Sequence, residues 1–212
     1  MFTGLIIALF AIVGAGAVVW GGMNALAKRA DRQLPDGERK RLGDGSGTPL
    51  FERTIKDVRV GDIVQHETSD FLVEGVVEYD EDGHKWRGAR LVDGRDERWL
   101  LVGLERGGAL SLRLLREAGD IHISGYPPEK LIANGTSFSQ EMRGTATAKI
   151  SGDAGKLPDT DGSGPDSVLR CRWWRYETAG NQALVVEQWG GLYRVLHGET
   201  INNSDVELMP GS

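Results

Sequence analysis

The pattern of hydrophobic and polar positions divides the chain into three parts. Residues 1–27 are almost entirely apolar or small and contain no charged side chain. Residues 28–56 are rich in charge and glycine and show no sustained apolar period. From there on, short β-branched or aromatic segments alternate with Gly and Asp turns, which is typical of β-strands. The pattern predicts a transmembrane helix over 1–27, a basic, Gly-rich linker over 28–56 and an all-β domain over 57–212.

The first segment is long enough to cross a bilayer as a helix. About 20 apolar residues span a hydrocarbon core of about 30 Å. A cleaved signal peptide is the alternative, because Ala25-Leu26-Ala27 offers a small-residue cleavage site. No Lys or Arg precedes the run, however, and the run is longer than a usual signal core. These two features favour a retained single-pass anchor.

The flanking charges predict the orientation of this anchor. None of the 25 Lys and Arg residues precedes the span, whereas Lys28, Arg29 and Arg32 follow it at once. The positive-inside rule therefore places the N-terminus outside and the β-domain in the cytoplasm. The same basic residues could contact anionic headgroups, although setting the topology is enough to explain them.

Small residues form one stripe along the predicted helix. They are Gly4, Ala8, Ala11, Ala15 and Gly22. Small residues let helix backbones approach closely in lipid, so this stripe predicts self-association of the chain. The alternative is that Gly and Ala are simply common in membrane spans.

The remaining chain is predicted to form a β-barrel or sandwich without a long helix. Strands are expected at residues 63–64, 71–79, 98–102, 109–115, 121–124, 145–151, 169–176, 183–188, 193–196 and 206–209. Asp82-Gly83 and Asp93-Gly94 are typical hairpin turns. A Trp-bearing strand followed by a hydrophobic strand ending near Glu occurs twice, after Trp86 and after Trp174. The domain is therefore expected to consist of two similar halves, about 57–125 and 140–211.

The net charge of −6 is the sum of opposed parts. Eight of the 25 basic and five of the 31 acidic residues lie in the first 56 residues, which leaves the β-domain near −9. An acidic domain argues against nucleic-acid binding, which requires basic surface. It also favours attraction of small cations such as polyamines.

Motifs for catalysis or metal binding are absent from the sequence. The four His residues are scattered, and zinc sites need clustered His and Cys ligands. No Gly-x-Ser-x-Gly elbow and no phosphate-binding glycine loop occurs. Cys171 lies between Arg170 and Arg172, but strand alternation directs those neighbours to the other face, which favours a buried structural thiol. We therefore expect no metal, no cofactor and no enzymatic activity.

Aromatic residues offer the best candidate for a partner surface. Five of the six Trp residues lie in the β-domain, several of them beside Arg. Trp173, Trp174 and Arg175 are the candidates, because adjacent residues of a strand point to opposite faces and at least one indole could be exposed. The alternative is that the Trp residues fill a small barrel while Arg faces solvent.

Several short motifs occur in an order that resembles the domain-of-unknown-function family 4178 (DUF4178). The opening half carries Val60-Gly61-Asp62-Ile63-Val64, Val73-x-Gly75, Trp86 with Leu91, and Trp99-Leu100. The closing half carries Gly155-x-x-Pro158, Trp174-Arg175-Tyr176-Glu177, Leu184-Val185-Val186-Glu187 and Leu208-Met209-Pro210-Gly211. The chain departs from the family's usual tyrosine step at Trp173-Trp174-Arg175-Tyr176.

The resemblance covers about residues 57–211 and implies a β-rich bacterial domain without an assigned activity. Members are associated with membrane-stress systems of the phage-shock type and with genes for polyamine synthase-like and small membrane proteins. We therefore expect a protein-interaction or scaffold module at the bacterial inner membrane. A polyamine or other small-ligand binding module and an uncharacterised membrane-proximal enzyme are the alternatives.

Overall fold

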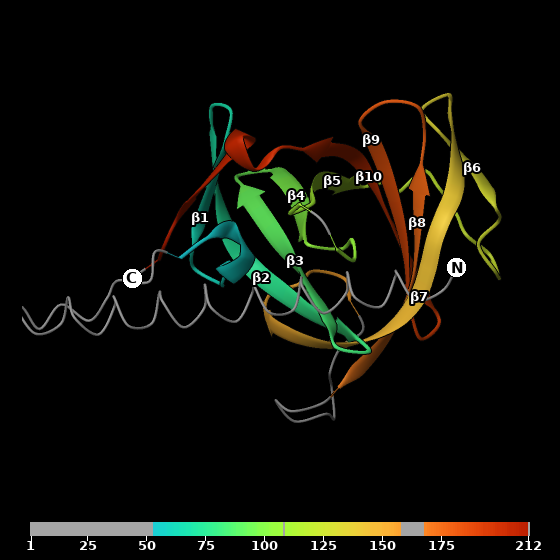
Figure 1. Cartoon of the computed structure of the whole chain (residues 1–212), viewed down its shortest axis with the longest axis horizontal. Coiled ribbons are helices and arrows are strands. Elements are labelled where there is room, and N and C mark those ends of the chain that lie inside the picture. The colour runs from blue at the N-terminus through green and yellow to red at the C-terminus, as the bar shows by residue number, and fades with distance from the viewer. Residues whose placement is uncertain (1–52, 108, 158–167, 212) are drawn as a thin grey trace, which may run out of the picture. The chain divides into compact units, whose positions relative to one another are not determined.

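The computed structural model describes residues 53–107, 109–157 and 168–211 (Figure 1). In these ranges it contains eleven β-strands and two short 3-10 helices, η1 (Ile55–Asp57) and η2 (Asn203–Asp205). The strands are β1 (Ile63–His66), β2 (Ser69–Glu81), β3 (His84–Asp93), β4 (Asp96–Val102), β5 (Leu112–Glu117), β6 (Lys130–Ala133), β7 (Thr136–Gly152), β8 (Leu169–Glu177), β9 (Gln182–Trp189), β10 (Leu192–Ile201) and β11 (Val206–Met209).

The predicted membrane helix, its stripe of small residues and nearly all of the predicted linker lie outside the described residues. Those small residues are Gly4, Ala8, Ala11, Ala15 and Gly22. Among the residues that are described, no helix combines the length and the apolar character that crossing a bilayer requires.

The sheet closes into an antiparallel barrel of eight strands. Two meanders, β2-β3-β4-β5 and β7-β8-β9-β10, are joined by the β5–β10 and β2–β7 pairings. Strands β1 and β11 continue the sheet beyond β2, and β6 continues it beyond β7, so these three lie outside the ring (Figure 1). The prediction of a mainly β, barrel-like domain is confirmed.

Barrel closure depends on a bend in β2 at Gly75. The register of β2 against β3 shifts between Val73 and Gly75, and from Gly75 onward β2 also pairs with β7. A Cβ atom at Gly75 would lie 2.0 Å from the carbonyl oxygen of Asp153. Only glycine lets the two backbones approach this closely, which is a common use of glycine within a strand.

The predicted hairpins are present. Asp82 and Gly83 connect β2 to β3 with φ angles of 52° and 86°. Two successive positive φ values are the signature of a type I′ turn, whose twist matches that of the strands. Gly94, with φ of 59°, connects β3 to β4.

The strand prediction is wrong at residues 121–124, which form part of the connection between β5 and β6. Ile121 and Ile123 alternate because both pack against the outer face of the barrel, and this packing imitates the period of a strand. Strand β6 and the first half of β7 were not predicted. β6 is only four residues long, and in the first half of β7 Thr, Ser and Gln alternate with the buried Phe138 and weaken the hydrophobic signal.

Strand alternation separates one core inside the barrel from two outside it. The interior contains Trp86, Trp99, Trp173 and Trp189. One outer core packs β1, η1 and the outer faces of β2 to β5, and the other packs loop and β6 residues onto β8 to β10. The interpretation that Trp residues fill a small barrel is confirmed for these four, whereas Trp174 lies in an outer core and Arg175 is buried rather than facing solvent.

Candidate functional site

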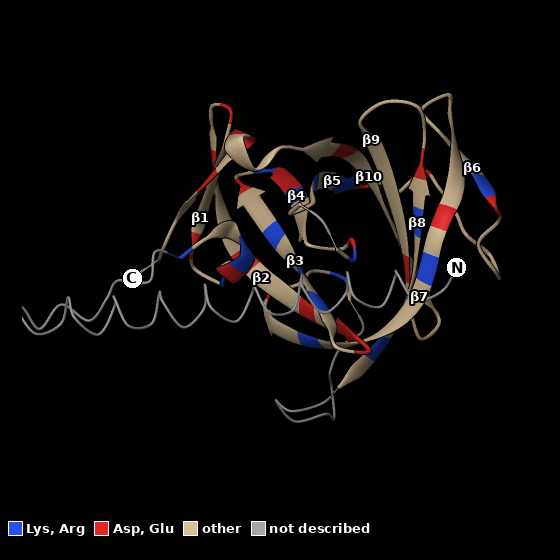
Figure 2. Cartoon of the chain, viewed as in Figure 1, with Lys and Arg blue, Asp and Glu red and all other residues tan. Residues whose placement is uncertain are grey.

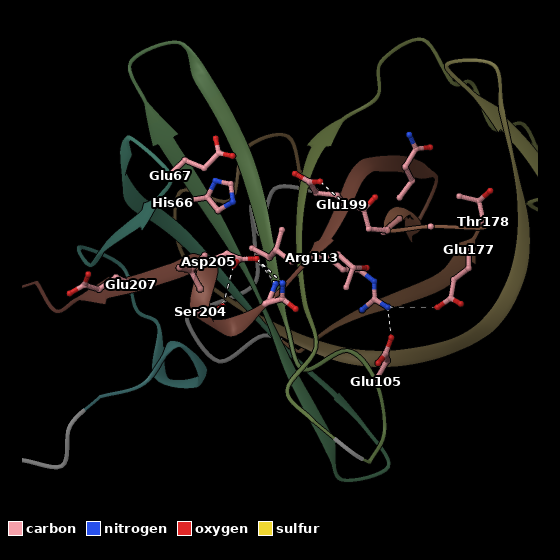
Figure 3. Close-up of a pocket in the computed structure, with 18 of the residues that line it drawn as sticks. His66, Glu67, Glu105, Arg113, Glu177, Thr178, Glu199, Ser204, Asp205 and Glu207 are labelled. Atoms are coloured by element: carbon pink, nitrogen blue, oxygen red, sulfur yellow. Dashed lines mark hydrogen bonds and ion pairs between the residues drawn. The ribbon is translucent and has the colours of Figure 1, made fainter.

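A pocket of about 980 Å³ opens at one end of the barrel. Because neighbouring strands run antiparallel, the β4–β5 and β8–β9 connections and the last residues of β10 all lie at this end. The turn between β1 and β2 and the chain from β10 to β11 complete the wall (Figure 3). This volume is at the upper end of the range found for small-molecule sites.

Carboxylates dominate the lining of this pocket. They are Glu67, Glu105, Glu177, Glu199, Asp205 and Glu207. Among the described residues, Arg113 is the only arginine or lysine that lines the pocket. Figure 2 shows acidic residues at the β1–β2 turn and along the chain from β10 to β11, where Glu67 and Asp205 lie. The wall therefore creates a negative potential in a concave site.

Arg113 lies between the walls, on the inward face of β5 (Figure 3). Leu112 and Leu114 point to the outer core and Leu115 to the interior, so alternation turns Arg113 inward as well. Its side chain is only 2% exposed. Nη2 donates a hydrogen bond to Glu105 and lies 3.9 Å from Glu177, whereas Nε and Nη1 have no partner among the described residues.

A second arginine shares both of these carboxylates. Arg175 follows Trp173 on the inward face of β8, and its Nη1 donates to Glu105 at 2.8 Å. Its Nη2 lies 3.1 Å from Glu177, and its Nε is also without a partner in the described part of the chain. Two arginines and two glutamates thus form one network beneath the pocket, with more guanidinium donors than it uses.

His66 forms part of the opposite wall (Figure 3). It is 6% exposed and is paired with Val206 of β11, which carries it next to η2. Hydrogen bonds from the backbone and side chain of Asn202 lower the pKa of Asp205, and the charge of His66 adds to this shift. The described residues provide no hydrogen-bond partner for the imidazole ring.

The arrangement suits an organic cation better than a metal ion. Metal ions require three or more His, Cys, Asp or Glu ligands that converge on one point. The described residues contain no such group, because the pocket carboxylates are spread around its wall. Separated carboxylates can instead contact separate ammonium groups of one molecule.

A comparison with known protein families identifies the domain. Residues 59–203 match the family described as domain of unknown function (DUF4178). The chain belongs to the DUF4178 family. No curated protein and no solved structure matches the chain. The match to DUF4178 includes His66, Glu105 and Arg113, but it ends before Asp205 and β11.

The prediction that at least one of the two neighbouring indoles of this DUF4178 domain is exposed is wrong, since Trp173 and Trp174 are each only 3% exposed. They do point to opposite faces, Trp173 into the barrel and Trp174 outward. The outer face of β8 is covered, however, and the ring of Tyr126 contacts Trp174 edge-on with centroids 5.7 Å apart. Arg175 is buried beneath the pocket by its ion pairs with Glu105 and Glu177.

The interpretation of Cys171 as a buried thiol of the DUF4178 core is confirmed. The residue lies inside the barrel, and its thiol is free. Burial raises the pKa of Cys171 well above its usual range, and the nearby Glu187 carboxylate raises it further. A thiol in this environment is protonated and inert.

The pocket of this DUF4178 domain was not found by sequence reasoning. Its residues come from five segments that are far apart in the sequence, and each segment alone resembles an ordinary solvated turn. One local signal was available. Arg113 interrupts the apolar run Leu112-Arg113-Leu114-Leu115 at a position that alternation turns inward.

Proposed function

We propose that this protein is a membrane-anchored, non-catalytic barrel module that binds a small ligand bearing amino groups, of the polyamine class. The observation that carries the proposal is the pocket with six carboxylates around one concave site. This choice favours the small-ligand alternative of the sequence analysis over the scaffold role, because the Trp surface that supported a protein partner is buried.

The electrostatics favour a ligand with more than one amino group. An exposed ion pair contributes only about 0.2–1 kcal/mol, so a single ammonium group would bind weakly. Glu67 and Glu199 are exposed and have no ion pair within the described residues. One flexible diamine can make several such contacts, and their contributions add. The negative potential of the domain also attracts the diamine from solution.

The distribution of the carboxylates supports binding without catalysis. Acid–base catalysis by two carboxyl groups usually needs one of them in a dry, apolar environment. Glu67, Glu199 and Glu207 are exposed, while Glu105 and Glu177 are held by arginines. Such groups are suited to attract and orient a cation.

The proposed cellular location rests on the sequence and is part of the same proposal. The uncharged N-terminal run and the basic residues after it support an anchor at a bacterial inner membrane, with the barrel in the cytoplasm. A protein-interaction role in a phage-shock-like stress system stays a prediction of the family resemblance.

The topology also supports the interpretation of the domain as two similar halves. Each half contributes four consecutive strands to the barrel. Trp86 and Trp174 both lie on the second strand of their meander, β3 and β8. Trp86 points into the barrel and Trp174 outward, so the support comes from the matching strand order and not from equivalent Trp positions.

Calorimetric titration of cadaverine and spermidine into the purified full-length chain tests the proposed function. We expect saturable binding at low salt that weakens at about 0.5 M salt, because screening shortens the range of the attraction. The double variant Glu67→Gln/Glu199→Gln should lower the affinity about fivefold, the loss of two exposed pairs.

The matched control is Glu117→Gln/Glu141→Gln, which removes the same charge at exposed positions outside the pocket. It should leave the affinity within about twofold. Absence of binding by cadaverine, spermidine and also lysine, or an equal loss in both double variants, would contradict a specific amine site.

A further inference from the structure

We infer that the ligand carries a hydrogen-bond acceptor, a carboxylate or carbonyl oxygen, which Arg113 binds while the pocket wall binds the amino groups. The ligand would then be of the amino-acid type rather than a simple diamine. This inference rests on the proposed function of the pocket and specifies the chemical class of its ligand.

The guanidinium of Arg113 is both buried and incompletely partnered. Its side chain is 2% exposed, and within the described part of the chain neither Nε nor Nη1 has an acceptor. Buried donors without acceptors are costly and uncommon in native proteins, so each one calls for an explanation. An acceptor supplied by a bound molecule is such an explanation, because Arg113 lines the pocket.

The same barrel gives another buried arginine protein partners at two of its nitrogens. Arg194 donates Nε and Nη2 to Glu187, and its guanidinium lies 3.8 Å from the ring centroid of Trp99. The fold is therefore able to enclose a guanidinium with its partners. Arg175, which lies beneath the pocket, has one open donor, whereas Arg113, which lines the pocket, has two.

Neighbouring ion pairs allow an acceptor to reach Arg113. Glu177 lies 3.9 Å from Nη2 of Arg113 and closer, at 3.1 Å, to Nη2 of Arg175. Glu177 can therefore move away from Arg113 and keep its closer partner. Figure 3 shows this glutamate on one side of Arg113 and His66 on the other, with the pocket between them.

The charge pattern discriminates between zwitterions and simple diamines. A diamine offers only donors and positive charge, and either end that approached Arg113 would meet a like charge without an acceptor. A molecule with an amino group and a carboxylate can place the first against Glu67 and Glu199 and the second against Arg113. Unpaired and like charges are the usual means by which a site rejects the wrong ligand.

Lysine and cadaverine test this inference as a matched pair, because cadaverine is lysine without its carboxylate. Calorimetric titration of each into the full-length chain should show lysine binding about tenfold more tightly, the effect of one charge-assisted hydrogen bond. Equal affinity, or tighter binding of cadaverine, would overturn the inference and leave the proposed function standing. If neither molecule nor spermidine bound, the proposed function itself would fail.

The variant Arg113→Met separates the role of Arg113 from the rest of the pocket. It should reduce lysine affinity about tenfold to the level of cadaverine, while cadaverine affinity stays equal or rises. Arg116→Met removes the same charge from an exposed position outside the pocket and should change neither affinity.

Arg113→Lys is the second variant, and it keeps the charge while removing the guanidinium donors. This variant, like Arg113→Met, should lose most of the preference for lysine over cadaverine. An unchanged preference in a folded Arg113→Met variant would show that the carboxylate binds elsewhere. The comparison in the unmodified chain decides the inference even if both variants fail to fold.

Discussion

Two buried arginines in the same barrel have opposite environments. Arg194 of β10 lies directly across from Glu187 of β9, and both residues are buried. Arg113 lies near the start of β5, where its partners Glu105 and Glu177 belong to a loop and a strand end. The first network is closed on itself, and the second is open to a pocket.

The closed network uses both oxygens of one carboxylate. Tyr79 donates to Oε1 of Glu187 at 2.8 Å, and Trp189 and Arg194 donate to Oε2 at 3.0 and 3.1 Å. Burial raises the pKa of Tyr79 well above its usual range, as does the Glu187 carboxylate, so the phenol keeps the proton that it donates. Satisfied polar networks of this kind specify one arrangement of a core.

The contrast shows how one fold uses the same residue type in two ways. In the closed network the protein supplies its own acceptor, the buried carboxylate of Glu187. At the barrel end, donors can remain open because a bound molecule can complete them. The partners around the guanidinium and its contact with the pocket, and not the residue type, therefore separate a structural arginine from a candidate binding arginine.

The largest expected loss of stability comes from a substitution that breaks the network of Glu187 and Arg194. Glu187→Gln removes the charge that compensates Arg194 and should lower the free energy of unfolding by about 3–5 kcal/mol. Urea denaturation of the full-length chain measures this change. Glu207→Gln is the control, since that glutamate is exposed, and it should stay within about 0.5 kcal/mol. A loss below about 1 kcal/mol at Glu187 would mean that the network is not structural.

Asp62 is a second carboxylate held by partners within the protein, and it predicts how the stability of the fold depends on pH. Asp62 is buried, which raises its pKa, but hydrogen bonds from the Gly211 backbone, Arg53 and the Arg59 backbone outweigh burial and hold the pKa below its usual value. A depressed pKa in the folded state stabilises the fold above about pH 4 and ceases to do so as the pH falls through the folded pKa.

Asp62→Asn should therefore lower the free energy of unfolding by about 1–3 kcal/mol at pH 7. The difference from the unmodified chain should shrink as the pH falls below about 4, where the carboxylate becomes protonated. Urea denaturation at pH 7 and near pH 3 measures both values. A difference that is equal at the two pH values would assign the effect to packing rather than to charge.

The smallest effect on stability is expected at the open network. Arg113→Met removes two unpartnered donors, and Arg175 still pairs with Glu105 at 2.8 Å and with Glu177 at 3.1 Å. The free energy of unfolding should change by less than about 1 kcal/mol, because an apolar side chain of similar length can replace a buried ion pair at little cost. A loss as large as that of Glu187→Gln would remove the distinction between the two arginines.

Sequence reasoning was most successful where local chemistry decides the structure. The Asp82-Gly83 turn, the inward alternation around Cys171 and the β-rich character of the domain all follow from local patterns. Trp174 shows the limit of this approach. Its strand and its outward direction were predictable, but the loop that brings Tyr126 against it lies almost fifty residues earlier in the chain.

The candidate site shows the same limit more strongly. An inward arginine at position 113 could be expected from alternation alone. That Glu105 and Glu177 would share it, and that His66 would face it across a pocket, depends on barrel closure and on the path from β10 to β11. Such contacts arise from the topology of the whole sheet and leave no periodic signal in the sequence.

The most direct test of the contrast between the two arginines is the ¹H–¹⁵N spectrum of the arginine side chains in the full-length chain, with and without lysine. The Nε–Hε signal of Arg113 is assigned by its loss in Arg113→Met, and that of Arg194 by its response to Glu187→Gln. Lysine should shift the Arg113 signal and leave the Arg194 signal in place. A spectrum in which saturating lysine leaves Arg113 unmoved, or shifts both signals alike, would contradict the assignment of Arg113 as the open arginine of a ligand site.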